Sequence, residues 1–173
     1  MRTLKHLLPC ALAALLTVSC GGKGPQIPSR RKGQAPAEDT AQLALMELNM
    51  RLAQTADAEL TRIASAKEEP YALYDANVWM LIIDRGNEDL PSPTGSCVLH
   101  MRTYSLDGRL LLDSEGTYRL GKNELPAGVE WNIDELHPGG RANMFVPWYM
   151  AYGQQGKAPV PPYENVFIEI ELK

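Results

Sequence analysis

The C-terminal segment, residues 144–173, is the part of the sequence that most constrains the fold. Its last element, Val166–Leu172, alternates apolar residues with Phe or Glu, which is the period of a strand that buries one face. A loop rich in Pro and Gly precedes it, after an apolar run that ends at Val146. Because exposed loops on a rigid frame commonly carry function, we expect Ala151-Tyr152-Gly153 and Val160-Pro161-Pro162 to include site residues.

Residues 1–19 predict an export signal rather than a folded element. Arg2 and Lys5 precede an apolar run, and a serine followed by Cys20 closes it. A small residue before the cysteine is typical of a lipoprotein signal peptide, so we expect lipidation of Cys20. Cleavage of an ordinary secretory signal nearby is the alternative. Residues 20–37 hold Gly, Pro, Ser and basic side chains, which predicts a flexible tether.

Composition, charge and the positions of Cys and His argue against nucleic-acid binding and against a metal site. With 45% hydrophobic and 22% charged residues, the sequence is that of a globular protein. A formal net charge of −4 provides no electrostatic footprint for nucleic acid, so we expect no nucleic-acid partner. Cys97 would be left without a disulfide partner after processing, and we expect it to be a small buried residue. His100 and His137 have no further ligands at metal-binding spacing, so no metal is expected.

A long helix is expected from Asp39 to about Lys67, within a helical segment that covers residues 38–69. The apolar residues that recur on one face are Leu43, Met46, Met50, Ala53 and Leu60. Pro70 then ends the helix. We favour packing of this helix on its own domain, and the alternative is a dimerisation arm that would make a homodimer.

The remainder of the chain predicts an antiparallel sheet curled around a short helix, which is an α+β fold preceded by the long N-terminal helix. Asp107-Gly108 is a turn signal between the second and third expected strands. Strands are expected at residues 77–84, 97–106, 109–112, 117–120, Arg141–Val146 and Val166–Leu172, and a short helix at residues 127–133.

Four segments, in this order along the chain, resemble FKBP-type peptidyl-prolyl cis-trans isomerases. Residues 105–114 resemble an Asp-Gly-x-x-Phe-Asp-Ser segment with one residue inserted. Residues 118–131 place Leu-Gly, Gly and Glu on family positions, and Ala151-Tyr152-Gly153 and Val160-Pro161-Pro162 match the family's C-terminal signature. The resemblance covers about residues 76–173. The chain is also similar to gliding-motility-associated lipoprotein isomerases of this family.

The resemblance implies a site made of two catalytic residues and an apolar wall. Tyr152 takes the position of the tyrosine whose hydroxyl binds the substrate carbonyl, and Asp113 takes the pocket aspartate. The implied substrate-binding residues are Met101, Leu112, Tyr118, Leu125, Pro126, Val129, Val160 and Ile168. The residues alone leave alternatives: Tyr152 could merely anchor its loop, Asp113 could be a carboxylate at a strand end or turn, and the aliphatic residues could belong to the core.

Several residues depart from the family pattern. Leu112, Val129, Ile168 and Met101 replace larger, mostly aromatic, side chains, so we expect a wider cup. Pro126 has no N–H where the family donates a backbone hydrogen bond to bound ligand. We therefore expect weak isomerase activity. The alternative is a non-catalytic chaperone or peptide-binding lipoprotein on the same fold.

The implied function is isomerisation of X-Pro bonds in exported proteins. This chemistry lowers the barrier to rotation about an amide, and it requires no cofactor, metal or nucleophile. The expected partners are unfolded or exported proteins that contain proline. The expected location is the periplasmic side of a bacterial cell envelope, anchored by lipid on Cys20 to a membrane, which we expect to be the outer membrane.

Overall fold

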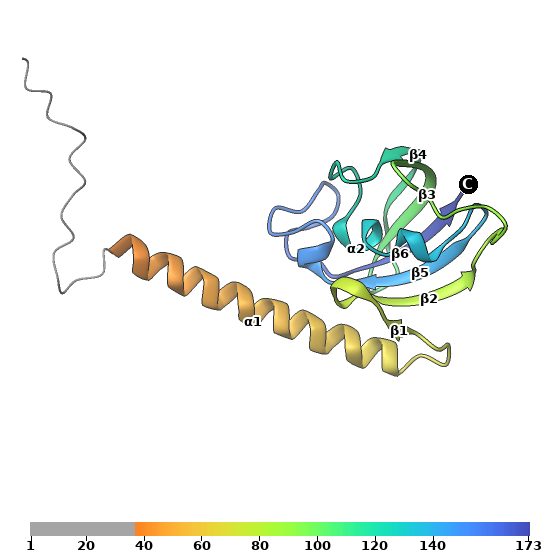
Figure 1. The fold of residues 1–173 in the computed structure, drawn as a ribbon. Helices are drawn as coiled ribbons and strands as arrows, with labels where there is room; N and C mark the ends of the chain where they lie inside the picture. Colours follow the sequence, from red (N-terminus) through yellow and green to blue (C-terminus); the bar gives the residue numbers. More distant parts are fainter. Residues whose placement is uncertain (1–36) are drawn as a thin grey trace, which may run out of the picture. The chain divides into compact units, whose positions relative to one another are not determined.

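The computed structural model describes residues 37–173 (Figure 1). The predicted signal peptide, lipidation of Cys20 and the tether as far as Pro36 lie outside the described residues. In the part of the chain that is described, no helix is both long and apolar enough to cross a membrane.

Within residues 37–173, six strands form one antiparallel sheet in the order β1-β2-β5-β6-β3-β4. The strands are β1 (Ala72–Leu73), β2 (Trp79–Asp84), β3 (Ser96–Ser105), β4 (Leu110–Arg119), β5 (Arg141–Val146) and β6 (Val166–Leu172). The β3–β4 hairpin turns at Gly108, whose φ of +90° favours glycine. Asp107 Oδ1 accepts the backbone N–H of Arg109 at 3.2 Å and stabilises that turn. The C-terminal strand β6 thus lies between β5 and β3 near the centre of the sheet (Figure 1).

The core lies between the inner face of the sheet and α2 (Ala127–Glu130) with the 3-10 helix η2 (Ile133–Glu135). The predicted alternation of β6 is confirmed, because every second residue from Val166 to Leu172 is buried. Val129 of α2 is fully buried in the same cluster. A Cβ on Gly128 would lie 2.7 Å from Val146 Cγ1, so glycine allows α2 to approach the sheet closely.

The expected α+β architecture is confirmed: an antiparallel sheet around a short helix, preceded by a long helix. Two details of the expected elements are wrong. Residues 109–112 and 117–120 are not separate strands but parts of one strand, β4, because Glu115 and Gly116 pair with β3. The short helix ends at Glu130 because the Asn132 side chain donates to the Gly128 carbonyl at 2.8 Å, which competes with further helical hydrogen bonds.

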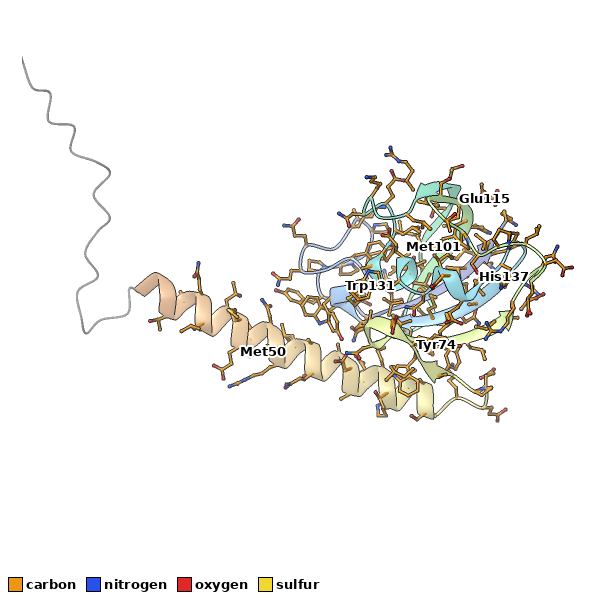
Figure 2. All side chains as sticks on the ribbon, in the orientation of Figure 1. Met50, Tyr74, Met101, Glu115, Trp131 and His137 are labelled. Carbon is orange, nitrogen blue, oxygen red and sulfur yellow. The ribbon has the colours of Figure 1, made fainter. Side chains whose placement is uncertain are left out.

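The long helix α1 (Ala37–Ser65) ends four residues before the expected limit of residue 69. Its C-terminal half packs on the domain as favoured, because Leu60 is 0% exposed and clusters with Phe145. Its N-terminal half is different. Large apolar residues there are exposed, and Figure 2 shows Met50, 58% exposed, on this part of the helix. The apolar stripe predicted from the sequence is therefore buried against the domain in the C-terminal half of α1 and exposed in its N-terminal half.

Two short 3-10 helices at the ends of strands lie in the region that α1 contacts. The segment η1 (Asp75–Asn77) precedes β2, and η3 (Trp148–Met150) follows β5. Three hydrogen bonds connect α1 to this region. The Tyr149 hydroxyl donates to Asp57 Oδ1 at 2.5 Å, and Asn77 Nδ2 donates to Asp57 Oδ2 at 3.3 Å. Asn165 Nδ2 donates to Glu59 Oε2 at 2.9 Å. Since η3 leads directly into the loop with Tyr152, α1 is connected to the segment that carries the expected site.

Candidate active site

A cavity of about 230 Å³ opens on the inner side of β3 and β4, beside the loops that flank α2 and follow η3. Met101 of β3 is buried, whereas Figure 2 shows Glu115 of β4 at the periphery of the domain. Apolar side chains make most of the wall, together with a few hydroxyl, amide and charged groups. The lining residues are Met101, Leu112, Ser114, Tyr118, Asn123, Glu124, Leu125, Pro126, Ala151, Tyr152 and Lys157.

The structure brings six of the expected site residues together in this wall: Met101, Leu112, Tyr118, Leu125, Pro126 and Tyr152. The other four do not line the cavity: Asp113, which is described below, and three aliphatic residues. Val129, Val160 and Ile168 are buried in the hydrophobic core, where they support the residues of the wall. These three side chains are therefore part of the core beneath the cavity rather than of its surface.

Tyr152 presents a protonated hydroxyl to the cavity. Its oxygen lies 3.0 Å from Thr103 Oγ1, which is on the buried face of β3. Burial raises the pKa of Tyr152, against a smaller lowering by the hydrogen bond with Thr103. The loop itself is closed by the N–H of Gly153, which donates to the Trp148 carbonyl at 2.8 Å. Tyr152 thus holds a hydrogen-bond donor in a wall that is mainly, but not wholly, apolar.

Asp113 does not lie in this cavity, and its expected place there is wrong. Its carboxylate is 52% exposed, and its Oδ1 lies 2.7 Å from Nε2 of His100 on the outer face of the sheet. Leu111 forms a bulge, since Thr103 pairs with Leu112 and Tyr104 pairs with Leu110. The extra residue shifts the alternation by one position, so Leu112 and Ser114 line the cavity and Asp113 faces outward.

The family of this domain follows from comparison with known proteins. A family model described as FKBP-type peptidyl-prolyl cis-trans isomerase matches residues 89–173. These residues form an FKBP-type domain. The expected resemblance to this family is therefore confirmed, whereas the likeness to gliding-motility-associated lipoprotein isomerases stays a prediction.

Relatives agree with this assignment. Peptidyl-prolyl cis-trans isomerase FKBP42 of Arabidopsis thaliana is 28% identical over 108 residues, covering 57% of this chain but only 30% of that protein's length. The solved N-terminal domain of FKBP42 is 26% identical with a TM-score of 0.51, covering 62% of this chain and 91% of that one. A peptidyl-prolyl cis-trans isomerase from Pseudomonas syringae has the same fold, with a TM-score of 0.58 at 20% identity, covering 81% of this chain and 96% of that one.

Pro126 gives the FKBP-type cavity a wall position without a backbone donor. Its carbonyl accepts the N–H groups of Val129 and Glu130, each at 3.0 Å, and so starts α2. The φ of −54° at this N-cap position is compatible with the proline ring, but proline leaves no N–H for a bound carbonyl.

Five cavity residues were missed by the sequence reasoning: Ser114, Asn123, Glu124, Ala151 and Lys157. For Ser114, the inserted residue in segment 105–114 was an available signal, because an insertion in a strand inverts the alternation beyond it. Its Oγ accepts a hydrogen bond from the Tyr118 hydroxyl at 3.1 Å. Glu124 and Lys157 come from loops, and no local sequence pattern places loop side chains around a cavity.

Glu124 is held by Arg119. The Arg119 Nε donates to Glu124 Oε1 at 2.7 Å, and the Arg119 backbone N–H donates to Oε2 at 2.8 Å. These hydrogen bonds lower the pKa of Glu124, so the carboxylate is ionised at neutral pH with its charge offset by the guanidinium. Among residues 40–173, no group of three His, Cys, Asp or Glu is arranged to hold a metal ion.

Proposed function

We propose that this chain is a peptidyl-prolyl cis-trans isomerase that acts on X-Pro bonds of exported proteins. The observation that carries the proposal is a mainly apolar cavity in an FKBP-type domain, with the partly buried hydroxyl of Tyr152 beside Thr103 in its wall. The chain covers only 30% of its curated relative, so the activity is proposed from this domain rather than transferred from that protein.

The geometry suits catalysis by an altered environment. Rotation about a peptide bond meets a barrier of about 18–20 kcal/mol because amide resonance is lost in the twisted state. An apolar wall around the proline favours the less polar twisted amide over the planar one. The Tyr152 hydroxyl would donate to the carbonyl of the substrate, while Thr103 fixes the tyrosine oxygen. A thousandfold acceleration requires only about 4 kcal/mol, which a small number of such contacts supplies.

The test is acceleration of cis-trans exchange in a short proline peptide by the purified protein. Exchange spectroscopy by NMR measures it without a coupling protease. The proposal expects catalysis that a Tyr152→Phe substitution reduces by about tenfold, since one hydrogen bond in the transition state is worth about 1–1.5 kcal/mol. A protein that leaves the exchange rate at its spontaneous value would refute it.

We also propose that the protein works in the cell envelope of a bacterium, on the periplasmic side of the outer membrane, with lipid on Cys20 as its anchor. The support is sequence alone: a basic N-terminus, an apolar run and a small residue before the cysteine. Mass spectrometry of the mature protein should find a diacylated or triacylated N-terminal cysteine. Fractionation of cells should move a Cys20→Ser variant out of the membrane fraction, and an unmodified wild-type N-terminus would contradict the anchor.

The N-terminal half of α1 is proposed to join two copies of this chain. Its exposed apolar residues are Leu43, Leu45, Met46, Leu48 and Met50. Leu43, Met46 and Met50 recur at spacings of three and four, which is the pattern of a helix-helix seam. Analytical ultracentrifugation should show a dimer that a Met46→Glu, Met50→Glu double variant converts to a monomer. A wild-type monomer at micromolar concentration would refute this assembly.

A second function is supported by Pro126: peptide binding without turnover, as in a chaperone. The cavity offers no backbone N–H at that position, which removes one contact to a bound carbonyl. Such a protein would suppress aggregation of an unfolded client while leaving the exchange rate of proline peptides unchanged. Measuring both properties on one preparation distinguishes the two functions.

A further inference from the structure

Two of the residues that line the FKBP-type cavity carry a charge, Glu124 and Lys157, and they come from different loops. Their charges are in very different situations. Both oxygens of the Glu124 carboxylate are engaged by Arg119, whose Nη2 also lies 2.5 Å from Oε1. The carboxylate is therefore already paired, and it has little capacity to select a charged substrate.

Lys157 is held by its backbone and unpaired at its ammonium. Its N–H donates to the Val160 carbonyl at 3.0 Å, and the Val160 N–H donates back to the Lys157 carbonyl at 2.6 Å. None of the ion pairs formed among residues 40–173 uses the Lys157 ammonium. The preceding Gly156 has a φ of +67°, and a Cβ there would lie 2.5 Å from the Val160 carbonyl oxygen, so this turn is sterically fixed.

The charges of Lys157, Glu124 and the adjoining Arg119 sum to +1 at the cavity, in a chain with a formal net charge of −4. Arg119 offsets Glu124, which leaves the charge of Lys157. A peptide whose proline enters the cavity must place its neighbouring side chains along this wall. An acidic side chain there gains an ion pair, whereas a basic one meets a like charge.

We propose that Lys157 makes this domain prefer segments that carry Asp or Glu next to the proline. The proposal rests on the proposed isomerase function, because it assumes that proline occupies the cavity. An ion pair at a partly exposed position favours the acidic peptide over its neutral isostere by about two- to fivefold at low salt. High salt should remove most of that preference, since the screening length falls from about 10 Å at 0.1 M to 3 Å at 1 M.

The experiment compares isosteric peptides that carry Glu or Gln on either side of a single proline. The exchange rate is measured by NMR, and binding is measured in parallel by titration calorimetry. The wild-type protein should prefer the Glu peptide at one of the two positions by two- to fivefold. Lys157→Gln should bring the Glu-to-Gln ratio to one, and Lys157→Glu should reverse it. The matched control is Lys122→Gln, which removes the same charge near the cavity from a residue outside its wall and should retain the preference.

Equal treatment of Glu and Gln peptides by the wild type at both positions would overturn the proposal. So would a preference that survives in Lys157→Gln, or one that Lys122→Gln abolishes equally, since the latter would reflect net charge only. These outcomes differ from failure of the isomerase function, in which neither peptide is isomerised. In that case the calorimetric ratio still decides whether Lys157 selects acidic segments.

Discussion

Asp57 provides the sharpest test of how α1 is attached to the domain. Its carboxylate accepts hydrogen bonds from the Tyr149 hydroxyl at 2.5 Å and from Asn77 Nδ2 at 3.3 Å. Asn77 also donates to the Tyr149 oxygen at 3.0 Å, so the three side chains form a closed network. Asp57→Ala removes the charged acceptor and leaves two donors without it. A hydrogen bond to a charged group contributes about 1.5–3 kcal/mol when buried.

We expect Asp57→Ala to lower the free energy of unfolding by about 1–3 kcal/mol, because the network is only partly buried and solvent replaces part of what is lost. Urea denaturation of the purified protein measures this change. The matched control is Glu47→Ala, which removes a carboxylate from the same helix. Glu47 forms an exposed pair with Arg51 at 2.5 Å, and such pairs contribute only about 0.3–0.5 kcal/mol. Equal losses for the two variants would refute the assignment of Asp57 as an anchor.

The same network predicts a dependence on alkaline pH. Burial, and then the hydrogen bond with Asp57, raise the pKa of Tyr149 from 10.0 to about 12. A pKa that is higher in the folded state means that this stabilisation is complete below pH 10 and is lost as the pH rises toward 12. In Asp57→Ala the pKa of Tyr149 should fall, though burial keeps it above its usual value. Ultraviolet titration, with Tyr149→Phe to assign the signal, measures it. An unchanged pKa would contradict the network.

Three further predictions concern the cavity. Thr103→Val keeps the shape of the buried side chain but removes its hydrogen bond to Tyr152, and it should lower kcat/KM about three- to tenfold. Thr103→Ser retains the hydroxyl and should keep most of the activity. An equal loss of activity in both variants would point to packing instead. Asp113→Asn should change kcat/KM by less than about twofold, because this carboxylate faces away from the cavity. A loss as large as that of Tyr152→Phe would mean that Asp113 acts on the bound substrate. Pro126→Ala restores a backbone N–H and should tighten binding of a proline peptide about fivefold by calorimetry; unchanged affinity would mean that no donor is used there.

The family and the types of the main elements could be read from the sequence because their signals are local. The period of two in Val166–Leu172 predicts a strand wherever the rest of the chain lies, and that strand is present with those bounds. The turn at Asp107-Gly108 is likewise specified by the residues that form it. Ordered motifs such as Ala151-Tyr152-Gly153 identified the family, and the family model agrees.

The residues that line the cavity could not be predicted from the sequence, because they are brought together by contacts between segments that are distant along the chain. An insertion in segment 105–114 was visible, but only the pairing of β4 with β3 shows that Leu111 forms the bulge and that Asp113 consequently faces outward. Both halves of α1 carry apolar residues, and only the packing of the domain on the C-terminal half decides that Leu60 is buried while Met46 is exposed.

What the sequence determined by itself is therefore the periodicity of its strands and helices, its turns and its family. The tertiary structure decided which side chains share a wall. Tyr149 meets Asp57 across 92 residues, and Thr103 meets Tyr152 across 49, because strand register and helix docking bring them together. Local propensity acts over a few residues, whereas a site is made by the packing of elements that are distant along the chain.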